Sequence, residues 1–305
     1  MRLSLGLLLL IGCTGVRIFA QDRGVNPLAE QIHRLELATG RAPASNDGKA
    51  WLKLAILRQD AARYRDSEQA YRRAIALLKS GERATLADAM DRLGTMYAEC
   101  GEIAKAEHLE RKALAIRERA RDVAGAGISH THLSVLLLGK RDFSAAEAEA
   151  EAATMMLIPE QTRPVPSLTT VTPEDRMSAL INLALVRCAR GACGSAVTQL
   201  KCALSIAHKN YPDNSIPVGF VDFLLGYALW MSGDSISAEE MMRSGTQELS
   251  TQIGWGHPMY VRVMRQYGMF LREAGRMSEA EEITARIAKF ERSPGTVDVQ
   301  SLMFR

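Results

Sequence analysis

Two groups of side chains in the last third of the sequence have the types and the spacing of a binding surface. Aromatic residues recur at helical spacing between positions 220 and 230, although aromatics make up only 6% of the chain. At the corresponding positions 42 residues later, arginines follow the same spacing. Residues three, four or seven apart share one face of a helix. The two sets are Phe220, Phe223, Tyr227 and Trp230, and Arg262, Arg265 and Arg272.

This pair of stripes predicts recognition of another protein. The rings would bury a large apolar side chain, and the guanidinium groups would pair with a carboxylate through two parallel hydrogen bonds. The predicted partner is therefore a protein or peptide that carries aromatic or apolar residues together with acidic ones. In the alternative interpretation, the aromatics pack against a neighbouring helix or the C-terminal tail, and the arginines lie on a solvated face.

The remaining chemistry-bearing residues form no catalytic or metal-binding pattern. The six histidines are scattered. His130 and His132 are two residues apart on a predicted helix, so they point in different directions and are not expected to share a metal ion. The nucleophile elbow, the P-loop, the zinc-protease motif and the dinucleotide fingerprint are all missing from the sequence. We therefore predict no enzyme activity, no cofactor and no metal site.

Charge and hydropathy argue against nucleic-acid binding and against a transmembrane span. The net charge of +3 is dispersed, without a long block of lysine and arginine, which argues against nucleic acid. No stretch beyond the first residues approaches the length and apolarity of a transmembrane span.

The N-terminus resembles an export signal. Arg2 precedes the apolar run Leu3–Gly12, and a small residue, Ala20, stands before Gln21. This pattern predicts a signal peptide over residues 1–20. Alternatively, residues 10–13 resemble a bacterial lipobox, with a lipoprotein signal over 1–12 and lipidation of Cys13. Either interpretation predicts a location in the periplasm or outside the cell, free or lipid-anchored to the bacterial envelope.

Four cysteines would remain after cleavage at Ala20. Their spacings match no zinc pattern, because none forms a Cys-x-x-Cys pair. We expect them to be buried as small apolar residues, and a bridge from Cys188 to Cys202 is the alternative, since an oxidising compartment permits disulfides. The four residues are Cys100, Cys188, Cys193 and Cys202.

The elements that must position these residues are revealed by an internal repeat. Leu225-Gly226, Gly233 and Ala238 recur 42 residues later as Tyr267-Gly268, Gly275 and Ala280, and four further copies precede them. Each copy is predicted to form two amphipathic helices. Glycine ends the first helix because it enters the left-handed conformation at no steric cost. Alanine lies where the helices cross, because a larger side chain would separate them. One pair cannot bury its apolar face alone, so neighbouring pairs must stack.

The segment from Asp91 to Ile116 resembles the tetratricopeptide repeat (TPR). The 42-residue period exceeds the usual period of about 34 and resembles that of the long-helix variant found in kinesin light chains. Three further segments resemble that variant: Asn182-Leu183-Ala184, the linker Tyr211–Val218 and the segment Gly254–Pro258. The resemblance covers about residues 50–292. It implies an all-α, right-handed superhelical solenoid of about six helix-turn-helix repeats. It also implies a concave groove, lined by the first helix of each pair, in which Asn182 matches an asparagine that holds a peptide backbone.

Irregularities of the period predict the domain organisation. An N-terminal helix (25–39) and a polar linker occupy residues 21–49, and a flexible tail occupies 293–305. The array divides into three repeats over 50–157, an insertion over 158–172, and three repeats over 173–292. The insertion contains prolines that cannot continue a helix, and Thr172 is the predicted N-cap of the next helix, which begins at Pro173. The sequence thus predicts a scaffold or adaptor, with a self-associating spacer of the cell envelope as the alternative.

Overall fold

The described part of the chain is helical throughout. The computed structural model describes residues 47–60, 63–78, 82–158 and 169–291. These residues form twelve α-helices and one short 3-10 helix, and no strand occurs among them. The predicted all-α fold is confirmed.

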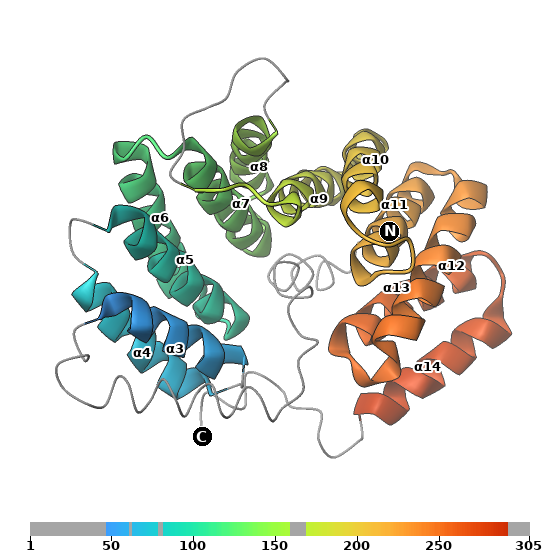
Figure 1. Ribbon diagram of the computed structural model, residues 1–305. Coiled ribbons are helices and arrows are strands. Elements are labelled where there is room, and N and C mark those ends of the chain that lie inside the picture. The colour runs from blue at the N-terminus through green and yellow to red at the C-terminus, as the bar shows by residue number, and fades with distance from the viewer. Residues whose placement is uncertain (1–46, 61–62, 79–81, 159–168, 292–305) are drawn as a thin grey trace. The chain divides into compact units, whose positions relative to one another are not determined.

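The α-helices follow one another as pairs joined by tight turns (Figure 1). In chain order the pairs are α3 (Gly48–Asp60) with α4 (Tyr64–Leu77), α5 (Arg83–Glu99) with α6 (Ile103–Arg119), α7 (Val123–Gly139) with α8 (Phe143–Leu157), α9 (Pro173–Ala189) with α10 (Cys193–Asn210), α11 (Ile216–Ser232) with α12 (Ser235–Gln252), and α13 (Pro258–Glu273) with α14 (Met277–Glu291). The 3-10 helix η2 (Gly254–Gly256) precedes α13.

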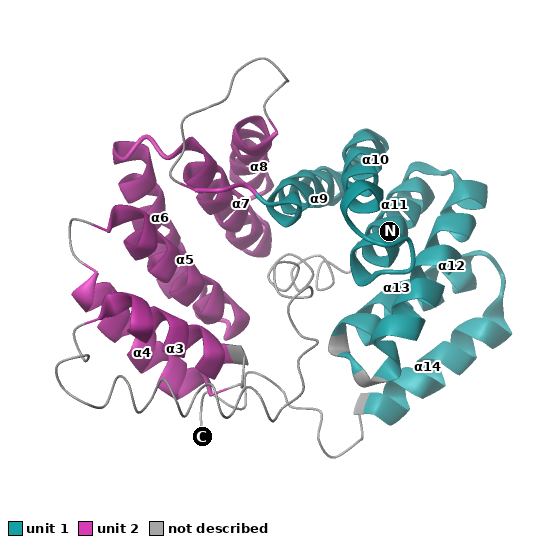
Figure 2. Cartoon of the chain, in the orientation of Figure 1, with its two compact units in different colours: residues 1–12, 172–297 teal, residues 13–171, 298–305 magenta. Residues whose placement is uncertain are grey.

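The chain divides into two compact units between Val171 and Thr172. Helices α3 to α8 form the N-terminal unit, and helices α9 to α14 form the C-terminal unit (Figure 2). Within each unit a helix contacts mainly the helices adjacent to it in the chain. This nearest-neighbour packing is the pattern of a helical repeat array.

In four of the pairs the turn uses a left-handed glycine, as the period predicts. Gly101, Gly191, Gly233 and Gly275 have φ between 78° and 97°. The next residue then closes the helix end, and Asp234 N–H, for example, donates to the Leu229 carbonyl at 3.0 Å. In the turn between α7 and α8, Arg141 takes the left-handed conformation instead, with φ of 63°.

Small residues allow the two helices of a pair to approach closely. The alanines predicted at the crossing points have no exposed surface: Ala106, Ala196, Ala238 and Ala280. On the facing helix of the fifth pair, a Cβ atom added to Gly226 would lie 2.7 Å from the Met242 backbone nitrogen. Helices α11 and α12 are therefore in backbone contact at this glycine.

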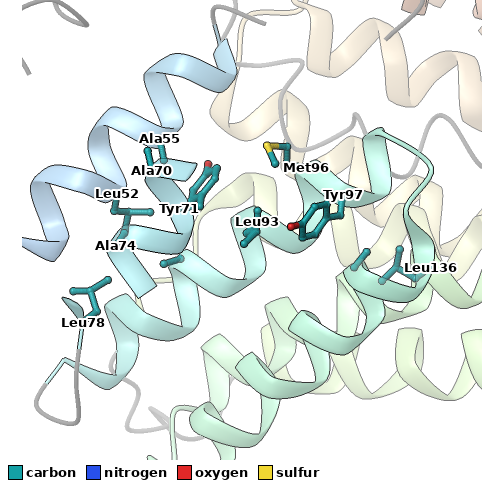
Figure 3. Packing of buried hydrophobic residues seen from close by; sticks show 12 residues of the cluster. Leu52, Ala55, Ala70, Tyr71, Ala74, Leu78, Leu93, Met96, Tyr97 and Leu136 are labelled. Atoms are coloured by element: carbon teal, nitrogen blue, oxygen red, sulfur yellow. The ribbon is translucent and has the colours of Figure 1, made fainter. Parts of the chain in front are cut away.

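One buried hydrophobic cluster of the N-terminal unit lies between α3 and its neighbours, and the hydroxyl of its Tyr71 is hydrogen-bonded. Leu52 and Ala55 of α3 belong to one buried cluster with Ala74 and Tyr71 of α4 (Figure 3). The fully buried Tyr71 hydroxyl donates to Gln59 Oε1 at 2.8 Å. Burying the ring therefore leaves its polar atom satisfied.

Helix α9 begins as its sequence predicts. Thr172 Oγ1 accepts the Asp175 N–H at 3.2 Å, and the Asp175 carboxylate accepts the Thr172 N–H at 2.8 Å. Pro173 occupies the first helical turn, where its missing N–H would have no partner. The predicted N-cap is therefore confirmed, and a reciprocal capping box reinforces it.

Several predictions lie outside the described residues. They are the signal peptide over 1–20 with its alternative over 1–12, the lipidated Cys13, the helix over 25–39, the proline-bearing part of the insertion over 159–168, and the tail over 293–305. The predicted domain boundaries stay predictions. Among the described helices, none combines the length and the apolarity that crossing a membrane requires.

Candidate functional site

The predicted aromatic stripe on α11 is mostly internal. Phe220, Phe223 and Tyr227 are only 2%, 0% and 8% exposed. Residues 217–228 of α11 are all buried. A helix that is apolar on every side belongs inside its fold. The rings of the stripe therefore pack inside the C-terminal unit, whereas the sequence predicted that they form a surface. Of the four aromatic residues, only Trp230 is partly exposed.

Four rings join α11 to α13 at this point. Trp230 packs edge-on against Tyr227 with ring centroids 5.8 Å apart, and edge-on against Phe270 at 5.6 Å. Phe270 in turn stacks on Tyr267 at 6.1 Å. The Trp230 Nε1–H donates to Glu273 Oε2 at 3.2 Å. These contacts fix the orientation of the half-buried indole.

The predicted arginine stripe is accessible on α13. Arg265 and Arg272 are exposed, and Arg262 is half-buried. Arg272 Nη2 donates to Thr284 Oγ1 of α14 at 2.7 Å. Arg265 and Arg272 are seven residues apart, which places them about 10 Å apart along the helix axis. We call Trp230, Arg265, Arg272 and Glu273 the Trp–Arg edge.

Asn182 lies away from solvent in α9. Its residue exposure is 5%, so its amide has little surface to offer a ligand in this conformation. The Trp–Arg edge, by contrast, combines a fixed aromatic ring with exposed cations. Such an arrangement can bind an apolar side chain and a carboxylate, and it contains no nucleophile paired with a base.

A second cluster, in the N-terminal unit, was not predicted from the sequence. Asp91 of α5, with Glu110 and Arg117 of α6, is 2%, 1% and 4% exposed respectively. His132 of α7 and the buried Ser129 complete the cluster. Charged side chains are almost never this deeply buried unless they are paired.

The members of this cluster are indeed paired. Arg117 forms an ion pair with Asp91. The same guanidinium donates to Ser129 Oγ at 2.8 Å and to the Gly125 carbonyl at 2.9 Å. His132 Nδ1 lies 3.2 Å from Glu110 Oε2. We call Asp91, Glu110, Arg117, Ser129 and His132 the buried charge cluster.

Burial dominates the protonation of its two acids. It raises the pKa of Glu110 to about 8. It also raises the pKa of Asp91, to which the neighbouring Glu110 charge adds, while Arg117 acts in the opposite direction. A proton is therefore held in the buried charge cluster near neutral pH.

Three members of the cluster have side chains of metal-ligating type. One ligand atom from each of Asp91, Glu110 and His132 lies within 4.8 Å of the others. Oxygen and nitrogen donors of this kind suit zinc. However, the Arg117 guanidinium already supplies a positive charge at the Asp91 carboxylate. The negative charge of the cluster is thus balanced by an internal cation.

As predicted, His130 points in a different direction from His132, because the partner of His130 is Glu149 of α8.

One signal in the sequence could have revealed the cluster. Glu110 follows Gly94 by 16 residues, and Met242 follows Gly226 by the same number. A Cβ atom on either glycine would meet that partner, at 2.8 Å from Glu110 Oε1 and 2.7 Å from Met242 Cγ. In these two copies the position holds an internal side chain, and a carboxylate there indicates a buried acid.

Comparison with known proteins identifies structural relatives. No protein-family model matches the chain, and no curated protein matches its sequence. Among solved structures, BtubC (BKLC) from P. vanneervenii is similar with a TM-score of 0.57 and 20% identity, covering 78% of this chain and 94% of BtubC. A putative kinesin light chain from Podosopora anserina with nearly identical TPR-like repeats gives 0.54 and 15%, covering 70% of this chain and 99% of that one.

A third solved structure is also similar to this chain. It is a Rap protein complexed with competence and sporulation factor, similar with a TM-score of 0.60 and 11% identity. The similarity covers 96% of this chain and 88% of the Rap chain. At these identities the likeness is one of fold.

Proposed function

Because the chain has the tetratricopeptide-repeat fold, we propose that it is a scaffold that binds a protein or peptide, and that the Trp–Arg edge contacts the ligand. The observation that carries this proposal is the half-buried Trp230, held by Tyr227 and Phe270, on a helix packed against the arginine-bearing α13. The ligand segment is expected to carry an aromatic or large aliphatic residue and an acidic residue.

The aromatic part of the edge supports this proposal through its rigidity. Contact residues that are already fixed lose little conformational entropy when a ligand binds. Trp230 is fixed by two ring contacts and by its hydrogen bond to Glu273. Tryptophans of this kind are frequent among the residues that dominate binding energy.

The cationic part of the edge supports a partner with a carboxylate. The guanidinium group presents its donors in a planar fork that matches two carboxylate oxygens. Arg265 and Arg272 are exposed on α13. With about 10 Å between them along the helix, they suit a ligand segment of several residues. The Rap protein complexed with competence and sporulation factor supports the wider idea that this fold can hold a separate ligand.

A selection from random peptides tests the proposal directly. The purified chain from residue 21 would be used to enrich a displayed library of such peptides. We expect the enriched peptides to share an aromatic or large aliphatic residue and an Asp or Glu. Trp230→Ala and Arg265→Glu should each weaken binding of an enriched peptide by about tenfold or more, as expected for central contacts worth at least about 1.4 kcal/mol.

Arg243→Glu is the matched control for the charge reversal. Arg243 is an exposed arginine of α12, outside the Trp–Arg edge, so its reversal should leave the affinity nearly unchanged. Helical content and thermal unfolding are measured for every variant. Full affinity in correctly folded Trp230→Ala and Arg265→Glu proteins would overturn the assignment of the edge.

We also propose that the chain is exported, on the basis of the pattern in residues 1–20. Mass analysis of the mature protein from a bacterial host would find an N-terminus at Gln21 for simple secretion or a lipidated Cys13 for a lipoprotein. An uncleaved Met1 would contradict both. The alternative function, a self-associating spacer, requires assembly without another partner, and sedimentation as a monomer at all concentrations would exclude it.

A further inference from the structure

Two buried thiols meet at the turn between α9 and α10. Cys188 is the penultimate residue of α9, and Cys193 is the first residue of α10. Their exposures are 2% and 3%. Both are free cysteines, and the side chain of each shifts the pKa of the other through a hydrogen-bond interaction. The bridge considered from the sequence paired Cys188 with Cys202, but Cys202 is exposed, and the neighbour of Cys188 is Cys193.

The backbone of the turn holds these two residues in place. Gly191 is left-handed, with φ of 83°. Its N–H donates to the Cys188 carbonyl at 2.9 Å, and the Ala192 N–H donates to the Arg187 carbonyl at 2.8 Å. These bonds fold the chain back directly before Cys193. A disulfide forms without backbone strain only where the chain already brings two cysteines close together, and this turn places Cys188 and Cys193 at its two ends.

The two sulfurs are not equivalent. Cys193 opens an 18-residue helix, and the N-terminal end of a helix dipole stabilises a thiolate. The hydrogen bond from Cys188 lowers the pKa of the Cys193 thiol, against the effect of burial. The same hydrogen bond, together with burial, raises the pKa of the Cys188 thiol. Cys193 is therefore the nucleophile of the pair, and Cys188 is the second thiol that reacts after it.

We propose that Cys188 and Cys193 form a thiol–disulfide site, which reacts with low-molecular-weight disulfides such as glutathione disulfide and closes the α9–α10 turn with a covalent bond. In the first step, the Cys193 thiolate attacks one sulfur of the small disulfide. A mixed disulfide forms, and one small thiolate leaves. In the second step, Cys188 loses its proton and attacks Cys193 Sγ, which releases the second small thiol. The two protein thiols are oxidised, and the small disulfide is reduced to two thiols.

Access to the pair comes from the turn. Arg190, Gly191, Ala192 and Gly194 are exposed, so local opening of the turn brings Cys193 to solvent. On the opposite side the pair faces Tyr227 of α11, which is buried. Burial raises the pKa of the Tyr227 hydroxyl, and the two nearby cysteine sulfurs raise it further.

The sequence around the pair allows a direct test. Trypsin cleaves after Arg187, Arg190 and Lys201, so the two cysteines fall in different peptides, 188–190 and 191–201, and Cys202 falls in a third. The full chain is incubated with glutathione disulfide, its remaining thiols are alkylated, and the digest is analysed without reduction. We expect peptides 188–190 and 191–201 to be joined, with the loss of two hydrogens.

Two single variants test the order of the steps. In Cys188→Ser the second thiol is missing, so glutathione should accumulate on Cys193. In Cys193→Ser the nucleophile is missing, and modification of Cys188 should be slower by about tenfold or more. Peptides 188–190 and 191–201 recovered unlinked from the wild-type chain, while the exposed Cys202 carries glutathione, would overturn the proposal. A link from either peptide to Cys202 or Cys100 would overturn it equally. The wild-type digest decides the question even if a variant fails to fold.

Discussion

Glu110 is a carboxylic acid in an environment that disfavours its charge. It is 1% exposed, and burial raises its pKa to about 8, whereas an unfolded chain releases this proton near pH 4.3 (about the model-peptide value). Between these two pH values the native state holds a proton that the unfolded state has lost. Stability is therefore expected to fall as pH rises through this window, by at most about 1.4 kcal/mol per pH unit for one proton.

Glu110→Gln tests this linkage because an amide cannot titrate. Urea unfolding of the variant between pH 5 and pH 8 should show a flatter dependence of the unfolding free energy on pH than the wild type. The control is Glu107→Gln, one turn earlier in α6. Hydrogen bonds from Lys140 and Arg111 lower the pKa of Glu107, so its contribution is lost only at acidic pH, and this variant should keep the wild-type slope. Equal slopes for all three proteins would contradict the assignment of Glu110.

At the scale of single residues, some structural features could be predicted from the sequence and others could not. The positive φ of Gly233 was predictable, because it follows from a local requirement of the turn. The burial of Phe220 and Phe223 was not, because the face that a first helix presents depends on the neighbouring pairs. Asp91, Glu110 and His132 come from three helices, and only the packed fold brings them together.

The two helices of a pair approach a small residue more closely in some pairs than in others. Gly226 and Gly268 occupy the same position in the fifth and sixth copies. A Cβ atom on Gly226 would lie 2.7 Å from the Met242 backbone nitrogen, which cannot rotate away. On Gly268 the nearest atom would be Ile283 Cγ2, at an ordinary contact distance of 3.4 Å. The two glycines therefore have different structural roles despite their equivalent places in the period.

Alanine substitution separates these roles. Gly226→Ala should lower the free energy of unfolding by about 1–3 kcal/mol, because the backbones of α11 and α12 must move apart. Gly268→Ala should be neutral or stabilising by up to about 1 kcal/mol, because alanine is the better helix former. Chemical denaturation of both variants measures the difference. A similar loss in the two would show that helix approach at Gly226 is not limiting.

At the scale of helices and turns, the sequence predicted most of what the structure shows. The period located the described helices and the left-handed glycines, and the Thr172-Pro173 pair located the N-cap of α9, since each depends on neighbours in the chain. It did not reveal that Arg141 enters the left-handed region in the turn between α7 and α8. Arginine gives no compositional signal of that conformation, which costs an L-residue about 1–2 kcal/mol.

As a whole, the described chain consists of two units with three helix pairs each. The predicted resemblance to tetratricopeptide repeats is confirmed at the level of fold by solved structures of low sequence identity. Its packing residues were recognisable because close helix approach restricts them to glycine and alanine. Binding residues have no such restriction. The sequence therefore predicted an aromatic surface that is mostly buried, with Trp230 and the arginines as its accessible part, and it does not identify the partner.

The central claim is that the Trp–Arg edge binds an acidic, apolar segment of a partner. A charge-swap measurement tests it most directly, using an enriched peptide and a second version in which its acidic residue is replaced by lysine. Isothermal titration of both peptides against the wild type and Arg265→Glu gives four dissociation constants. We predict that Arg265→Glu weakens binding of the acidic peptide by about tenfold or more and restores binding of the lysine peptide. Equal affinity of wild type and variant for each peptide would contradict the claim.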